Sequence, residues 1–209
     1  GGVITDSGKF DWEASGKFPI LTEPDPSYHD LSYTKDVGAS AFIFRARAKL
    51  MRDLGACMSS FNAFLLLQGL ETLSLQVERH VENAKAVAEW LQKHPKVAWV
   101  NYPSLEGNPY HELAKKYFPK GSGSIFSFGV KDGYEAAKRT IEGMKLISHL
   151  ANVADAKSLA IHPASTTHQQ MTSEQCAAAG ISDDMIRLSV GIEYIDDILN
   201  DLDKALSNA

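Results

Sequence analysis

The sequence predicts an α/β or α+β fold, in which helices cover a sheet, and two observations carry this prediction. After Pro95, β-type apolar runs alternate with helical ones, as in residues 125–130 followed by residues 134–146. Before Pro95, apolar residues recur at helical spacing over residues 73–91. This long helix should stop at His94 and Pro95, because proline cannot continue a helix.

The N-terminal third predicts a strand, a loop and two helices. Residues 1–10 have a β-type pattern and a turn at residues 6–8. Residues 11–38 carry scattered aromatic and proline residues, which predict an irregular loop that is either functional or a surface or oligomer contact. The expected helices cover residues 41–53, ended by Gly55, and residues 61–70, with Ser60 as the N-cap.

The remaining elements alternate between strands and helices. Strands are expected at residues 97–102, 125–130, 147–153, 159–161 and 185–192. Helices are expected at residues 112–117, at 134–146, after a capping box at 172–175 with Gly180 beyond its end, and along the apolar stripe from Ile195 to Leu206.

The composition is that of a soluble globular protein. The chain has 209 residues, of which 44% are hydrophobic and 22% charged. Its net charge of -5 argues against nucleic acid or an anionic membrane as a partner, and no apolar run approaches the roughly 18 residues that a membrane span needs. The two cysteines, Cys57 and Cys176, make no disulfide framework; we expect both to be small buried hydrophobic residues in a reducing cytosol.

Arg187 is a charged residue in the middle of an apolar strand, and its position requires a chemical explanation. It lies mid-strand between Ile186 and Leu188, where an arginine is costly unless it is paired or faces a cleft. Its planar guanidinium matches a carboxylate with two hydrogen bonds, as in many amino-acid sites. The spacing equally allows an internal salt bridge to Glu193 or Asp184.

Other candidate motifs are weaker. His162 and His168 lack the third and fourth ligands that zinc requires, so we expect no metal there and read them as polar loop residues near a substrate site. Residues 121–124 (GSGS) lead into a strand rather than a helix, so they predict a turn and not a phosphate loop. No G-x-S-x-G motif of a hydrolase is present.

Several long segments resemble one known family. They are residues 60–73 (SFNAFLLLQGLETL), 79–84 (RHVENA), 94–97 (HPKV), 154–168 (ADAKSLAIHPASTTH), 183–193 (DDMIRLSVGIE) and the loop over residues 28–43. In order and without large gaps, they resemble the O-acetylhomoserine sulfhydrylase branch of the Cys/Met-metabolism enzymes, which use pyridoxal phosphate (PLP). The resemblance covers essentially the whole chain.

The resemblance implies a fold-type-I PLP-dependent transferase. Residues 1–75 would be the end of the large cofactor domain, and residues 76–209 the bridging helix and the complete small C-terminal α/β domain. Arg187 would bind the α-carboxylate of the amino-acid substrate. Asn152 takes a position where relatives use serine in the same pocket, and Thr167 would support that pocket. The resemblance assigns Ser158 and His162 to the scaffold.

The same resemblance places the Schiff-base lysine of PLP upstream of Gly1, together with the other residues that hold the cofactor. The chain would therefore hold no catalytic residue and be inactive alone, and the opening Gly1-Gly2 resembles a strand already under way in a cut chain. Its expected partner is an N-terminal half carrying the lysine, within a cytoplasmic homo-oligomer, a dimer of dimers. The implied reaction replaces the acetate of O-acetylhomoserine by sulfide or a thiol, giving homocysteine or methionine.

Two alternatives stay open. A related cystathionine γ-synthase, or a methionine or cystathionine γ-lyase, would share the carboxylate site, although the loop over residues 28–41 favours the sulfhydrylase. The other alternative is a non-catalytic fragment that acts only as a structural partner of a separate N-terminal half.

Overall fold

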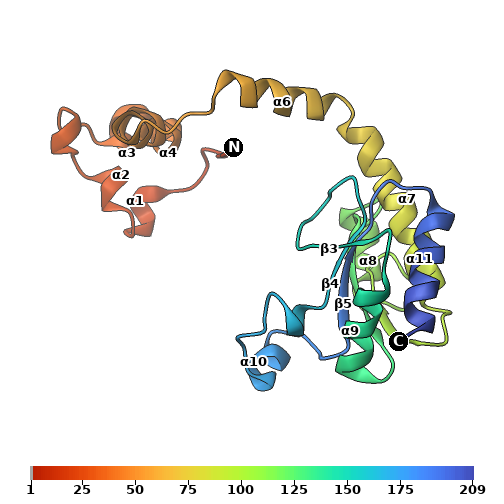
Figure 1. Cartoon of the computed structure of the whole chain (residues 1–209). Coiled ribbons are helices and arrows are strands. Elements are labelled where there is room, and N and C mark those ends of the chain that lie inside the picture. Colours follow the sequence, from red (N-terminus) through yellow and green to blue (C-terminus); the bar gives the residue numbers. More distant parts are fainter. Residues whose placement is uncertain (1) are drawn as a thin grey trace. The chain divides into compact units, whose positions relative to one another are not determined.

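The computed structural model describes residues 2–209, and the chain divides into two compact units, Gly1–Gly69 and Leu70–Ala209. Each unit is described by itself (Figure 1). The assignment of residues 1–75 to a cofactor domain and of residues 76–209 to a small domain stays a prediction. No helix of the described residues is long and apolar enough to cross a membrane.

The first unit contains short helical turns around a small aromatic cluster. Leu21, Tyr33 and Ala41 form its buried centre. Burial and a hydrogen bond of 2.8 Å to Asp25 raise the pKa of the Tyr33 hydroxyl to about 12. The elements are α1 (Trp12–Ser15), α2 (Pro19–Thr22), a 3-10 turn η1 (Pro26–Tyr28), α3 (Tyr33–Val37) and a 3-10 turn η2 (Gly38–Ser40).

The prediction of an irregular loop over residues 11–38 is wrong, because side chains cap several short turns there. The Asp11 carboxylate accepts a hydrogen bond from Ala14 N at 2.9 Å and starts α1. The Asp25 carboxylate accepts one from Ser27 N at 3.0 Å and starts η1. Caps of this kind satisfy backbone groups in turns too short to show a hydrophobic period.

The predicted strand over residues 1–10 is also wrong for the part described. Residues 2–10 form no strand, because a strand needs the backbone of a neighbour and none of the described residues pairs with this segment. The turn is confirmed: Gly8 has a φ of 66°, and its N–H donates to Asp6 Oδ1 at 3.2 Å.

The helix over residues 41–53 is confirmed, with a π-helical segment inside it. It consists of α4 (Ala41–Arg45), η3 (Ala46–Met51) and α5 (Arg52–Leu54), and Gly55 ends it with a φ of 68°. Helix α6 (Ser60–Glu71) follows. Ser60 is not its cap as predicted; the Ser59 hydroxyl accepts from Asn62 N at 3.2 Å.

The second unit begins with α7 (Leu73–Leu91), which stops before Pro95 as predicted. A five-stranded sheet follows in the order β1-β2-β5-β4-β3, antiparallel except between β3 and β4. The strands are β1 (Val97–Asn101), β2 (Ile125–Val130), β3 (Ser148–His149), β4 (Leu159–Ile161) and β5 (Met185–Ser189); the helices are α8 (His111–Tyr117), α9 (Gly133–Gly143), α10 (Ser173–Ala178) and α11 (Ile195–Ser207), with a 3-10 turn η4 (Pro163–Ser165).

One face of this sheet is covered by helices and the other is more open. Phe126, Phe128, Ile186 and Leu188 point into the main core, against which α7, α9 and α11 pack (Figure 1). Because side chains alternate along a strand, the residues between them point to the opposite face. There Arg187 is only half-buried, so the sheet presents it away from the helices.

Two predicted strands and one helix are too long. The strand over residues 147–153 is reduced to Ser148–His149, because the chain turns at Ala154, which has a φ of 54°. Helix α9 ends at Gly143 rather than at residue 146. Strand β5 ends at Ser189, since the N–H groups of the next residues bond to the loop before β4: Gly191 N to Ser158 Oγ at 2.8 Å, and Ile192 N to Ala156 O at 3.0 Å.

The predicted capping box is confirmed. The Thr172 side chain accepts from Gln175 N, and the Gln175 side chain accepts from Thr172 N at 2.9 Å. Gly180, just beyond this helix, has a φ of 74°, as expected of a residue that ends a helix in the left-handed region.

Gly129→Ala should destabilise the second unit by about 2 kcal/mol, because β2 has no room for a methyl group there. A Cβ at Gly129 would collide with the Trp99 ring and the Asp184 carboxylate, which are hydrogen-bonded to each other at 2.8 Å. Urea unfolding of the chain measures this loss. Gly69→Ala is the control, since nothing lies within 4 Å of its added methyl group; an equal loss in both variants would contradict the prediction.

Candidate functional site

Arg187 lies at the centre of the open face of the sheet. Its strand β5 pairs with both neighbours, and Arg187 is opposite Ser127 on β2 and Ile161 on β4. The adjacent Ile186 and Leu188 are fully buried in the core. This anchoring fixes the direction in which the Arg187 side chain leaves the sheet, because neighbouring strand residues point to opposite faces.

A cavity of about 360 Å³ opens beside Arg187. Its walls are mostly apolar, and among the described residues that line it Arg187 is the one Lys, Arg, Asp or Glu. The lining residues are Asn101, Ile125, Phe126, Ser127, Ile161, Pro163, His168, Ile181, Met185 and Arg187. A single guanidinium in a largely apolar hollow suits a small anion with an aliphatic body, such as an amino acid.

The internal salt bridge considered for Arg187 does not form, because both candidate carboxylates are engaged elsewhere. Glu193 accepts hydrogen bonds from Ser158 N at 2.6 Å and from Ser158 Oγ at 2.9 Å. Asp184 accepts from Trp99 Nε1 at 2.8 Å. Across residues 2–209, Arg187 makes no ion pair with any carboxylate. Its guanidinium is therefore available to a ligand.

Asn152 is exposed, and its amide donates to Asp155 Oδ2 at 3.4 Å. The turn that carries it is tied to β5, because Ala154 N donates to Ser189 Oγ at 3.2 Å. Ser189 is two residues beyond Arg187 and shares its face of the sheet. The structure thus brings the Asn152 turn to the end of the Arg187 strand, without a hydrogen bond between Asn152 and Arg187.

Thr167 lies at the rim of the same region. It is exposed, and its hydroxyl is hydrogen-bonded to His168 Nδ1 at 2.8 Å. His168 itself lines the cavity with Arg187, whereas Thr167 does not. The expectation that His168 belongs to a polar loop beside a substrate site therefore agrees with its position.

Sequence reasoning missed Ser127, which lies directly opposite Arg187. The signal was present: Ser127 is the polar residue between Phe126 and Phe128 in a strand with a period of two. Asn101, at the end of β1, also lines the cavity and was not predicted. Its place depends on which strands are neighbours, which no local pattern reveals.

Metal and cysteine chemistry gain no support. The part of the chain that the structure describes holds no group of three or more histidine, cysteine or acidic side chains able to bind a metal. Cys176 is buried as expected, but Cys57 is exposed. The expectation for Cys57 is wrong because the segment between α5 and α6 has no core around it.

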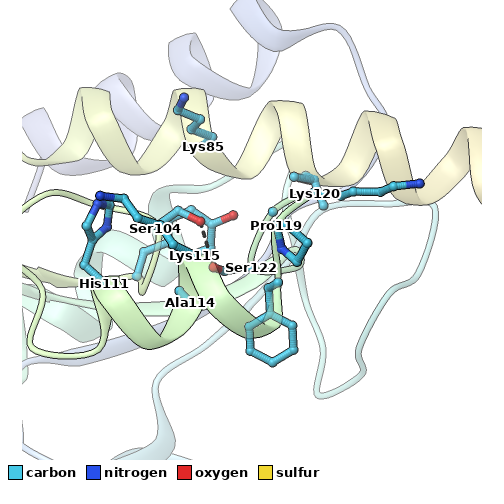
Figure 2. Close-up of a pocket in the computed structure, with 12 residues that line it drawn as sticks. Lys85, Ser104, His111, Ala114, Lys115, Pro119, Lys120 and Ser122 are labelled. Atoms are coloured by element: carbon cyan, nitrogen blue, oxygen red, sulfur yellow. Dashed lines mark hydrogen bonds between the residues drawn. The ribbon is translucent and has the colours of Figure 1, made fainter.

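A second cavity, of about 370 Å³, lies between α7, α8 and the segment before β2 (Figure 2). The hydroxyls of Ser104 and Ser122 bond to each other at 2.7 Å, and Lys115 pairs with Glu112 at 3.0 Å. Figure 2 shows the ammonium groups of Lys85 and Lys120 pointing away from the two serines. Of the three lysines that line this cavity, Lys115 is paired and the other two point away from the serines, so the Arg187 cavity is the better candidate site.

Comparison with known proteins decides the family. The profile described as "Cys/Met metabolism PLP-dependent enzyme" matches residues 1–207. This chain belongs to that family. The similar curated proteins include O-acetyl-L-homoserine sulfhydrylase 1 of Thermus thermophilus, 53% identical over 99% of the chain, and homocysteine synthase of Schizosaccharomyces pombe, 52% identical over 100% of it. The chain spans about half the length of the curated relatives it matches (49% of each of these two).

Solved structures confirm the fold-type-I prediction. A putative O-acetylhomoserine (thiol)-lyase of Campylobacter jejuni, which contains a pyridoxyl-lysine, superposes with a TM-score of 0.82 and 44% identity, over 90% of this chain and 45% of that one. The O-acetylhomoserine sulfhydrylase of Wolinella succinogenes superposes with a TM-score of 0.73 and 35% identity, over 96% of this chain and 50% of that one. The prediction of PLP as the cofactor agrees with the family.

The Arg187 cavity does not itself fit the role of a PLP-lysine site. PLP enzymes of this kind attach the cofactor to a lysine amine, and none of the described residues that line this cavity is a lysine. Its one guanidinium and its polar rim fit a carboxylate instead.

Proposed function

We propose that this chain forms the substrate-carboxylate side of a PLP-dependent O-acetylhomoserine sulfhydrylase. The enzyme would replace the acetate of O-acetylhomoserine by sulfide or a thiol, giving homocysteine or methionine. The unpaired guanidinium of Arg187 in a mostly apolar cavity carries the proposal, and the names of relatives about 50% identical over the whole chain support it.

Arg187 would hold the α-carboxylate of the substrate with two charged hydrogen bonds. The apolar walls strengthen this attraction, because a charge pair is screened less away from water. A carboxylate held at two points cannot rotate freely, so the reacting bonds of the substrate stay aligned, and such alignment lowers a barrier by several kcal/mol. When bound, PLP supplies an electron sink for the carbanion chemistry.

Asn152 and Thr167 would complete the carboxylate site from its rim. Each carries a side-chain hydrogen-bond donor and is exposed. The turn of Asn152 is bonded to Ser189 at the end of β5, and η4, just before Thr167, contacts β5. In the complete enzyme each would donate one hydrogen bond from an uncharged group to the carboxylate. Their contribution should be smaller than that of Arg187, since neither brings an opposite charge or a pair of parallel donors.

We further propose that an N-terminal half carrying the PLP lysine completes the active site, and that this chain alone is inactive. Helix α6 supports such a partner. Its large apolar side chains are all exposed, for example Phe61 at 68% and Leu67 at 61%, whereas a helix that is apolar all round is normally buried. The complete enzyme would be a cytoplasmic homotetramer, as the family resemblance implies.

A γ-synthase or γ-lyase would use the same carboxylate site, so Arg187 does not separate these activities. The names of the similar curated proteins favour the sulfhydrylase, since they include several sulfhydrylases and homocysteine synthases. The exposed apolar side chains of α6 fit the purely structural alternative as well, but that alternative gives the unpaired guanidinium of Arg187 in its cavity no role.

The complete enzyme, incubated with O-acetylhomoserine, should form homocysteine in proportion to the sulfide added. With neither sulfide nor thiol, it should release little keto acid. Mass spectrometry of the products with sulfide, with cysteine and with no acceptor makes the comparison. Keto acid formed at the same rate without an acceptor would indicate a γ-lyase, and cystathionine formed from cysteine in preference to homocysteine would indicate a γ-synthase.

A further inference from the structure

His162 is a buried histidine directly behind the wall of the Arg187 cavity. Only 1% of its surface is exposed, and both ring nitrogens are hydrogen-bonded. Nε2 lies 2.7 Å from the carbonyl oxygen of Asp183, and Nδ1 lies 2.8 Å from the Ser165 hydroxyl. A carbonyl oxygen can only accept, so Nε2 carries the proton. Nδ1 and the Ser165 hydroxyl share the second hydrogen bond.

The two partners of this ring belong to two segments that contribute residues to the cavity lining, although Ser165 and Asp183 do not line it themselves. Ser165 lies in the loop over residues 163–168, which contributes Pro163 and His168 to the lining and carries Thr167. Asp183 lies two residues before β5, the strand of Arg187. The ring therefore connects the loop to the segment that leads into the Arg187 strand.

The hydrogen bonds of the His162 ring distinguish it from an apolar ring of similar size. The Tyr134 ring contacts it edge-on, with centroids 4.8 Å apart, and a phenyl ring would keep that contact. A phenyl ring would lose both hydrogen bonds and leave the carbonyl of Asp183 without its donor. Since buried polar groups without partners are unfavourable, the loop should then move away from the strand.

We propose that His162 is a positioning residue for the substrate carboxylate: its ring, with a proton on Nε2, holds the loop over residues 163–168 against the segment that leads into β5. Thr167 and His168 are thereby kept beside Arg187. This inference rests on the proposed role of Arg187. We therefore expect that removing the hydrogen bonds of His162 weakens substrate binding, while the PLP content and the kcat at saturating substrate stay nearly unchanged.

The test compares variants of the complete enzyme. His162→Phe should raise KM for O-acetylhomoserine about tenfold, the loss expected for two hydrogen bonds, with kcat changed less than about threefold. Ser165→Ala removes only the loop-side bond and should raise KM about threefold. His162→Gln can still donate to the Asp183 carbonyl and should recover part of the loss. His111→Gln is the matched control, since His111 lies outside the Arg187 cavity.

Hydrogen exchange supplies a second measurement that does not depend on turnover. The amides of residues 164–168 should exchange faster in His162→Phe and Ser165→Ala than in the parent enzyme. Faster exchange with an unchanged KM would overturn the positioning role, and so would no change in either quantity. If His162→Phe does not fold, Ser165→Ala decides by the same criteria. An unchanged KM in Arg187→Ala would instead refute the proposed function, whatever the loop does.

Discussion

Replacing Arg187 by alanine in the complete enzyme lowers kcat/KM for O-acetylhomoserine by roughly a thousandfold and leaves PLP bound. The loss follows from two charged hydrogen bonds in a mostly apolar cavity, because removing one partner of such a pair costs about 2–5 kcal/mol. The remaining described residues that line the cavity offer no second cation to take over the carboxylate. Steady-state kinetics and the absorbance of bound PLP measure the two quantities separately.

Two controls sharpen this experiment. Arg187→Lys keeps the charge but not the planar pair of donors, so it should recover part of the activity. Arg139→Ala, on the exposed surface of α9, removes the same side chain away from the cavity and should behave like the parent enzyme. Loss of PLP with normal handling of the substrate would show that Arg187 serves the cofactor, and the carboxylate assignment would be wrong.

Replacing Asp201 by alanine destabilises the second unit by about 4 kcal/mol, because three amides, one buried and two partly buried, lose a charged acceptor. The Asp201 carboxylate on α11 accepts from the N–H groups of Lys145 at 2.9 Å, Leu146 at 3.0 Å and Ile147 at 3.0 Å. These amides end the segment between α9 and β3, and Asp201 is only 8% exposed. Urea unfolding monitored by tryptophan fluorescence gives the change in free energy.

Asp203→Ala is the control on the same helix. The Asp203 side chain is 58% exposed and pairs with His94 at 3.3 Å, so its loss should cost less than about 1 kcal/mol. Asp201→Asn should fall between the two, since an amide oxygen still accepts but carries no charge. A cost for Asp201→Ala no larger than that for Asp203→Ala would contradict the structural role of this carboxylate.

Elements whose causes are local could be predicted from the sequence. The stop of α7 before Pro95, the capping box at Thr172 and the turn at Gly55 each depend on residues a few positions apart. The start of β3 depends instead on Asp201, more than 50 residues further on, which binds the amides just before it. No periodicity in residues 147–153 contains that information.

The candidate site also has one feature that the sequence predicts and one that only the structure reveals. The mid-strand position of Arg187 was visible in the sequence, but whether it is paired was not. The answer came from Ser158, which engages Glu193 across 35 residues of sequence, and from Trp99, which engages Asp184 across 85. Which donor reaches each of these carboxylates depends on contacts between segments far apart in the sequence, and only the folded chain reveals those contacts.

The most direct test of the carboxylate role is a crystal structure of the complete enzyme with an unreactive analogue of O-acetylhomoserine bound. We expect the α-carboxylate of the analogue to lie about 2.8 Å from two nitrogens of the Arg187 guanidinium, with Asn152 and Thr167 at its edge. A carboxylate bound elsewhere, with Arg187 paired to a side chain of the protein, would contradict this account.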